Sequence, residues 1–194
     1  MPRMIKAFSA IKACRLLFIL AIGAFFSIAS LSCSGSSNDS QSSQPSKIKA
    51  GDSAPQFTAV DYKGKPYRLE DFRGQKVLLV FYMGYFCGGC KQNLSDLAKS
   101  ADELKREAAV LAISVDPPSE SVKMNQLLNG AFTLISDPEL KIIRDYDVEM
   151  ANMASPMADD WYVIIDKDGQ ISTRVQDTLF GQHADRILSA LKKT

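Results

Sequence analysis

The chain has 194 residues, of which 46% are hydrophobic and 23% charged, so its composition is that of a folded domain rather than of a disordered or collagen-like protein. Its formal net charge of +1 provides no basic field that would make a nucleic acid the expected partner. The single histidine, His183, excludes sites that need several imidazoles, such as three-histidine zinc centres. The remaining candidates for metal or redox chemistry are the four cysteines, Cys14, Cys33, Cys87 and Cys90.

The first 32 residues have the pattern of an export signal. Four basic residues and no acidic residue precede an uncharged apolar run at residues 16–31. This run is shorter than the roughly 20 residues that a membrane-spanning helix needs, and it matches the apolar region and cleavage segment of a signal peptide. We therefore exclude residues 1–32 from the fold and predict a signal peptide there.

The end of this segment resembles the lipobox of bacterial lipoproteins. Ser30, Leu31 and Ser32 stand before Cys33, although a lipobox usually has leucine where Ser30 stands. The resemblance implies that Cys33 becomes the lipidated first residue of a protein anchored in the bacterial cell envelope and facing the periplasm or the exterior. An uncleaved membrane anchor and a secretory signal cut at another position are the alternatives, and each also puts the domain outside the cytoplasm.

A serine-rich stretch follows the predicted lipidation site. Residues 34–46 contain seven serines and no apolar residue that could be buried, so we predict a flexible tether at residues 33–46. Processing would then remove Cys14, and lipidation would remove Cys33, from thiol chemistry. From Cys33 onward the chain has 19 basic and 22 acidic residues, a net charge of −3.

The remaining segment, residues 47–194, alternates apolar strand patterns with amphipathic helix patterns. Strands are expected at residues 56–60, 67–69, 76–83, 109–115, 132–135, 161–166 and 170–175. Helices are expected at residues 90–108, 120–129, 138–146 and 184–192, and Asp137 is expected to cap the third of them. The alternation predicts one α/β domain whose central sheet has helices on both faces.

Two cysteines three residues apart lie where the strand at 76–83 meets the following helix. At a helix start, the free N–H groups and the helix dipole stabilise a thiolate, so Cys87 is predicted to be the nucleophile. Cys90 lies one turn further in and is predicted to resolve the mixed disulfide. Gly88 and Gly89 leave space for a substrate. The pattern predicts a redox-active Cys87–Cys90 pair that needs no other cofactor.

Other interpretations of the cysteine pair are open. A structural disulfide would close a very small loop and stabilise the fold little. A zinc site would need four ligands, which two thiols and one histidine do not supply. A Cu(I) site is compatible with two thiolates, with help from Met150, Met153 or Met157.

The chain from Ala50 to its C-terminus resembles the redoxin branch of the thioredoxin superfamily, of the alkyl hydroperoxide reductase and thiol-specific antioxidant (AhpC/TSA) type. The segments that carry the resemblance are AGDSAPQFTAVDYKGKPYRLEDFRGQKVLLVFY, FYMGYFCGGC, AVLAISVD, LISDPELKIIRDYDV and YVIIDKDGQI. The resemblance implies a thioredoxin-like fold with a central mixed β-sheet flanked by helices, and no metal.

The resemblance points to two catalytic reactions. In thioredoxin-like reductases the first cysteine of CxxC is the nucleophile and the second the resolver, which correspond to Cys87 and Cys90, and Lys91 also matches. In peroxiredoxins the peroxidatic cysteine corresponds to Cys90, and a threonine is expected at position 87. Here that threonine is a cysteine, an expected proline is Met83, and no arginine stands just before WYVIID. These departures favour the dithiol reductase.

Thioredoxin-like proteins also place a cis-proline just before the penultimate strand, where it faces the CxxC motif. The corresponding position here is near Asp160, and the nearest proline is Pro156. Trp161 begins the following strand. The candidates for the substrate groove are Gly88, Gly89, Lys91, Pro156 and Trp161.

The sequence therefore predicts a thiol–disulfide oxidoreductase of the cell envelope. Its expected partners are a protein or small-molecule disulfide or a hydroperoxide, an electron-donating thiol, and the lipid bilayer through Cys33. The alternatives are a peroxiredoxin-like hydroperoxide reductase that uses Cys90 and a Cu(I)-binding chaperone.

Overall fold

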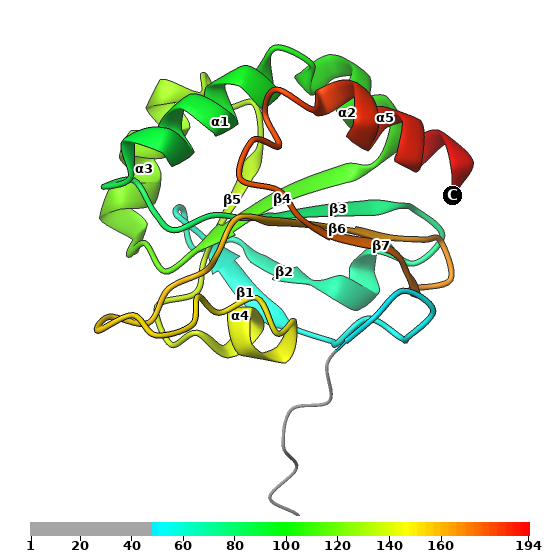
Figure 1. Cartoon of the computed structure of the whole chain (residues 1–194), viewed down its shortest axis with the longest axis horizontal. Helices are drawn as coiled ribbons and strands as arrows, with labels where there is room; N and C mark the ends of the chain where they lie inside the picture. Colours follow the sequence, from blue (N-terminus) through cyan, green and yellow to red (C-terminus); the bar gives the residue numbers. More distant parts are fainter. Residues whose placement is uncertain (1–47) are drawn as a thin grey trace, which may run out of the picture. The chain divides into compact units, whose positions relative to one another are not determined.

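The computed structural model describes residues 48–194 (Figure 1). The predicted signal peptide, the lipidation site Cys33 and the tether at 33–46 lie outside the described residues, so they stay predictions. Within residues 48–194 we find no helix with the length and apolarity required to cross a bilayer.

A seven-stranded mixed sheet forms the centre of the domain, in the order β2-β1-β5-β4-β3-β6-β7. β3 pairs in parallel with β4, and β4 with β5, while the remaining neighbours pair antiparallel. This arrangement confirms the predicted mixed sheet. The strands are β1 (Thr58–Asp61), β2 (Pro66–Arg68), β3 (Val77–Phe81), β4 (Ala109–Ser114), β5 (Thr133–Ser136), β6 (Trp161–Ile165) and β7 (Ile171–Gln176).

β3 is buried along its whole length because it has a strand on each edge and a hydrophobic core on each face. Since successive side chains point to opposite faces, Leu78 and Val80 enter one core, while Leu79 and Phe81 enter the other. This double burial explains why the sequence of β3 is a continuous apolar run rather than an alternating one.

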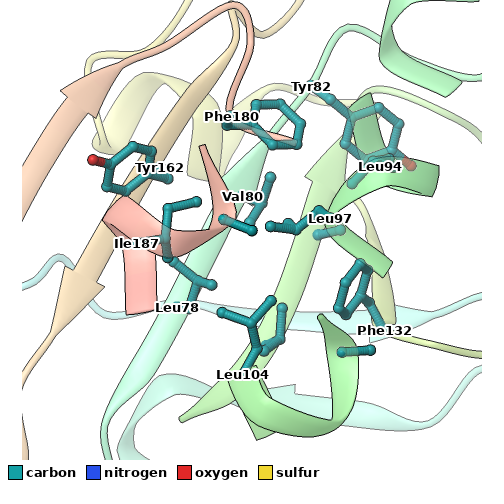
Figure 2. Close-up of a cluster of buried hydrophobic side chains, with 14 of the residues drawn as sticks. Leu78, Val80, Tyr82, Leu94, Leu97, Leu104, Phe132, Tyr162, Phe180 and Ile187 are labelled. Carbon is teal, nitrogen blue, oxygen red and sulfur yellow. The ribbon is translucent and has the colours of Figure 1, made fainter. Parts of the chain in front are cut away.

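Helices cover both faces of the sheet, as predicted. The first core lies under α1, α2, α3 and α5, and the second under α4 and a short 3-10 helix, η1 (Figure 1). In the first core, Leu97 and Ile187 lie beside Val80 of β3 (Figure 2). The helices are η1 (Leu69–Phe72), α1 (Gly88–Ala98), α2 (Ala101–Glu107), α3 (Pro118–Leu127), α4 (Lys141–Asp145) and α5 (Ala184–Lys193).

The single helix predicted at 90–108 is wrong in one respect, because the structure divides it into α1 and α2. Two short-range bonds tighten the chain at the break, from Lys99 N–H to the carbonyl of Asp96 and from Ser100 N–H to that of Leu97. Both helices still bury leucines in the first core. The spacing of the apolar residues therefore continues from α1 into α2, and for this reason it does not reveal the bend between the two helices.

The predicted start of the helix after β5 is also corrected. α4 begins at Lys141, and Leu140 before it has a left-handed backbone with φ of 59°. The Asp137 carboxylate accepts hydrogen bonds from the N–H groups of Lys141 and Ile143, both at 2.9 Å. Asp137 thus caps the helix across an intervening turn rather than from the adjacent position.

Candidate active site

The cysteines lie where the chain leaves β3 and enters α1. Cys87 is the N-cap residue of α1, and its Sγ accepts a hydrogen bond from the Cys90 N–H at 3.0 Å. The two cysteines form a disulfide, with their Cα atoms 5.3 Å apart. The N–H groups and the dipole of the helix start favour negative charge on Cys87 Sγ once the disulfide is reduced. The fold therefore brings the two predicted cysteines together at the start of α1.

The two sulfurs differ in their access to solvent. Cys87 is partly exposed and Gly88 and Gly89 are exposed, whereas Cys90 is 0% exposed. A Cβ atom at Gly88 would meet nothing within 4 Å, so the space beside Cys87 is open. A partner can therefore reach Cys87 directly, while Cys90 faces the first core, as the sequence predicts.

A buried carboxylate, Asp116, holds the loop between β3 and Cys87. The Tyr85 N–H donates to both Asp116 oxygens, at 2.8 and 3.1 Å, and the Ser114 hydroxyl donates to Oδ2 at 3.0 Å. Burial raises the pKa of Asp116 above its usual range. Gly84 has φ of +152°, and a Cβ there would lie 2.7 Å from Asp116 Oδ1, so this approach requires glycine. Sequence reasoning missed Asp116, whose only local signal is an aspartate directly after a buried strand.

A second buried carboxylate, Asp160, lies against the inner cysteine. Its Oδ1 is 3.9 Å from Cys90 Sγ, and the side chain is in the core. Burial raises the pKa of Asp160 from 3.8 to about 6, and the negative charges of Asp159 and Asp177 add to the effect. The site thus has a carboxylate where the resemblance leads us to expect a cis-proline or a peroxidatic arginine.

Strand pairing explains how Asp160 reaches the site. β6 runs antiparallel to β3 in a register that places Trp161 opposite Phe81. Asp160, just before Trp161, therefore lies at the end of the sheet where the chain leaves β3 towards Cys87. In the sequence, this position corresponds to that of the expected cis-proline, and the pattern predicts no role for the aspartate.

The other predicted groove residues have different locations. Lys91 lies in the first turn of α1, with Nζ 4.8 Å from the centre of the Tyr85 ring. Pro156 is exposed, and the peptide bonds of residues 48–194 are all trans, so no cis-proline serves the groove in this range. Trp161 packs against the second core, on the other face of the sheet from Cys90, with Arg174 stacked 3.9 Å from its ring centre. The structure therefore brings Lys91, but not Trp161, to the face of the sheet that carries the cysteines.

Metal binding finds no further support in the described part of the chain. Within residues 48–194, no group of three or more histidine, cysteine or acidic side chains is placed to hold a metal ion. His183 Nδ1 lies 2.7 Å from Asp177 Oδ2.

Comparisons with known proteins show what the chain is similar to. The family model described as the AhpC/TSA family matches residues 50–174. Peroxiredoxin Bcp of Escherichia coli K12 is 35% identical over 153 residues, which cover 75% of this chain and 97% of the relative. The thiol-disulfide oxidoreductase ResA of Geobacillus kaustophilus is 26% identical over 147 residues, which cover 75% of this chain and 79% of the relative.

A solved structure gives the same result for the fold. Peroxidoxin BcpB of Mycobacterium tuberculosis superposes with a TM-score of 0.66 at 24% identity, covering 75% of this chain and 97% of that one. The predicted thioredoxin-like fold is thereby confirmed.

The raised pKa of Asp160 predicts a pH-dependent stability of the disulfide form. Between the ordinary pKa of 3.8 in the unfolded chain and about 6 in the folded chain, the folded state binds more protons than the unfolded state. The contribution of Asp160 to the free energy of unfolding therefore has its full value at low pH and decreases as the pH rises through this window. We expect the difference in unfolding free energy, wild type minus Asp160→Asn, to decrease between about pH 4 and about pH 6 and to be flat above about pH 7.

Urea unfolding of the two oxidised proteins across this pH range is the measurement. The other buried carboxylates with raised pKa, Asp116 and Asp137, are present in both proteins, so their contributions cancel. A difference that does not change with pH would contradict the prediction.

Proposed function

Since the chain belongs to the AhpC/TSA family and is a thiol-based oxidoreductase of the thioredoxin superfamily, we propose that it exchanges disulfides through the Cys87–Cys90 pair. The observation that carries this proposal is the contrast between the two sulfurs. Cys87 is accessible at a helix start, whereas Cys90 is enclosed behind it. Phe86, next to Cys87, is 66% exposed and offers apolar surface to a partner. The relative named as a thiol-disulfide oxidoreductase supports the same reaction.

The proposed reaction proceeds in two steps. The Cys87 thiolate attacks one sulfur of a partner disulfide, forms a mixed disulfide and releases the other partner sulfur as a thiolate. Cys90 then attacks the Cys87 sulfur, which releases the second partner thiolate and forms the Cys87–Cys90 disulfide. Two electrons pass from the cysteine pair to the partner, and the reverse sequence oxidises a partner dithiol.

Hydroperoxide reduction is the second candidate function, and the curated relatives favour it over disulfide exchange. The most similar relatives that we report include a peroxiredoxin matched over nearly its whole length. In this reaction the Cys90 thiolate would attack the peroxide, release an alcohol and become a sulfenic acid. Cys87 would then condense with it, releasing water and forming the same disulfide, which a thiol donor would reduce.

The local chemistry at Cys90 supports exchange over peroxide reduction. A peroxidatic cysteine has to be a thiolate that the peroxide can reach, and an adjacent cation stabilises it. Here the side chain that faces Cys90 Sγ is the Asp160 carboxyl group, and Cys90 is fully buried. A negative charge at this position opposes ionisation of Cys90. The same carboxylate leaves Cys87, the exposed sulfur, as the favoured site of thiolate charge.

For the location we propose a lipid-anchored protein of the bacterial envelope. The proposal rests on the uncharged apolar run at 16–31, on Cys33 after a lipobox-like sequence, and on the serine-rich residues 34–46. A lipid on Cys33 and the tether would hold the domain near a membrane surface.

Substitution of Cys87 tests the exchange reaction. With insulin as substrate and dithiothreitol as reductant, Cys87→Ser should lower turnover by at least about 100-fold, because the accessible nucleophile is lost. Cys90→Ser should still attack once and then remain as a mixed disulfide at Cys87, which mass spectrometry detects. Unchanged turnover in Cys87→Ser would contradict the assignment.

Oxidation by hydroperoxide separates the two candidate functions. One equivalent of hydrogen peroxide or cumene hydroperoxide, added to the reduced protein, should form the disulfide only as slowly as it oxidises a free small-molecule thiol. Stopped-flow fluorescence of Trp161 or quenched thiol titration measures the rate. Fast stoichiometric oxidation that persists in Cys87→Ser, with a sulfenic acid on Cys90, would establish the second candidate instead.

Lipidation is tested with the full chain in a bacterium that processes lipoproteins. Cys33→Ser should abolish incorporation of labelled palmitate and move the protein from the membrane fraction to the soluble fraction. Cys14→Ser is the matched control and should keep both the label and the membrane location. Palmitate incorporation that survives Cys33→Ser would contradict the proposal.

A further inference from the structure

Asp160 is an acidic residue that contacts the buried sulfur of Cys90. Its Oδ1 lies 3.9 Å from Cys90 Sγ, and both side chains are buried. Within residues 48–194, none of the ion pairs includes Asp160. A carboxylate without a cationic partner is costly to bury, so the protonation state of Asp160 is easily changed.

We propose that Asp160 is the proton acceptor for Cys90 during resolution of the mixed disulfide. The inference rests on the proposed exchange reaction and adds a residue to it. Cys90 must lose a proton before it can attack Cys87, because the thiolate rather than the thiol is the nucleophile. Cys90 Sγ has no exposure through which water could take that proton. The Asp160 carboxylate is within reach of an S–H donor.

The surroundings of Asp160 adjust its basicity for this transfer. Asp160 N–H donates to Asp159 Oδ1 at 2.8 Å, and Asp177 N–H donates to the Asp160 carbonyl at 2.9 Å, so both carboxylates are close. His183 and Arg186 contact Asp177, at 2.7 and 3.6 Å, and offset part of its charge.

Burial and the two neighbouring charges raise the Asp160 pKa to about 6, which brings it closer to that of a thiol. A smaller difference between the pKa values of the thiol and the carboxyl group makes the proton transfer between them less unfavourable in free energy.

The Cys90 thiol gives its proton to the Asp160 carboxylate, and the Cys90 sulfur attacks Cys87 Sγ of the mixed disulfide. The new Cys87–Cys90 bond forms, the bond between Cys87 and the partner sulfur breaks, and the partner leaves as a thiolate. In the reverse direction, protonated Asp160 returns the proton to the Cys90 sulfur as the disulfide opens.

The test follows the two steps separately with 5,5′-dithiobis(2-nitrobenzoate) and the reduced protein. The first equivalent of coloured thiolate reports attack by Cys87, and the second reports resolution by Cys90. In Asp160→Asn we expect an unchanged first phase and a second phase slowed by about 100-fold, the usual contribution of general base catalysis. The wild-type second phase should accelerate with pH through the Asp160 pKa of about 6, and this inflection should be absent from the variant.

Asp159→Asn is the matched control because it removes the same charge from the adjacent residue, whose carboxylate contacts the Asp160 backbone rather than Cys90. It should keep a fast second phase and move the inflection to lower pH, since a neighbouring negative charge is lost. Asp160→Glu keeps a carboxylate and should therefore restore a pH-dependent second phase. If Asp160→Asn does not fold, a second phase without pH dependence in Asp160→Glu would overturn the inference.

An unchanged second phase in Asp160→Asn would overturn the inference alone. Equal slowing of both phases would also overturn it, because a merely structural role predicts that result. Absence of the first phase in the wild type would instead contradict the exchange reaction at Cys87, and the inference with it.

Discussion

The burial of β3 on both faces and along both edges is the constraint on which the site depends. Because β3 is held between parallel β4 and antiparallel β6, its end has a fixed position and delivers the chain to Cys87 at the start of α1. The same pairing sets Trp161 opposite Phe81, which brings Asp160 to that end of the sheet. One pair of strands thus fixes both the sulfurs and the carboxylate.

The two sulfurs of the disulfide lie in opposite electrostatic environments. Cys87 Sγ accepts a backbone N–H at the positive end of α1, whereas Cys90 Sγ faces the Asp160 carboxyl group. The helix start favours a thiolate on Cys87, and the carboxylate disfavours one on Cys90. In the proposed exchange reaction, the nucleophile and the resolving thiol therefore differ in their electrostatic environment as well as in exposure. The charged group that contacts Cys90 Sγ is thus an acidic one, whereas a cation would stabilise a thiolate there.

Most of the fold could be predicted from local patterns because its elements are strongly periodic. The apolar runs at β3, β4 and β6 and the amphipathic spacing of α5 were predicted within one or two residues. The break between α1 and α2 and the late start of α4 could not be predicted in this way. Both depend on backbone bonds that leave the apolar spacing unchanged, and such bonds have no periodic signal.

The sequence by itself determined the cysteine pair, since three-residue spacing at a helix start places two cysteines within disulfide reach wherever the helix lies. Only the tertiary structure decided what surrounds them. Asp160 is 70 residues from Cys90 in the chain, and Asp116 is 31 from Tyr85, so their contacts depend on strand register rather than on any local pattern. Side-chain alternation along β6 likewise put Trp161 on the far face of the sheet, because a change of one residue in a strand reverses the face.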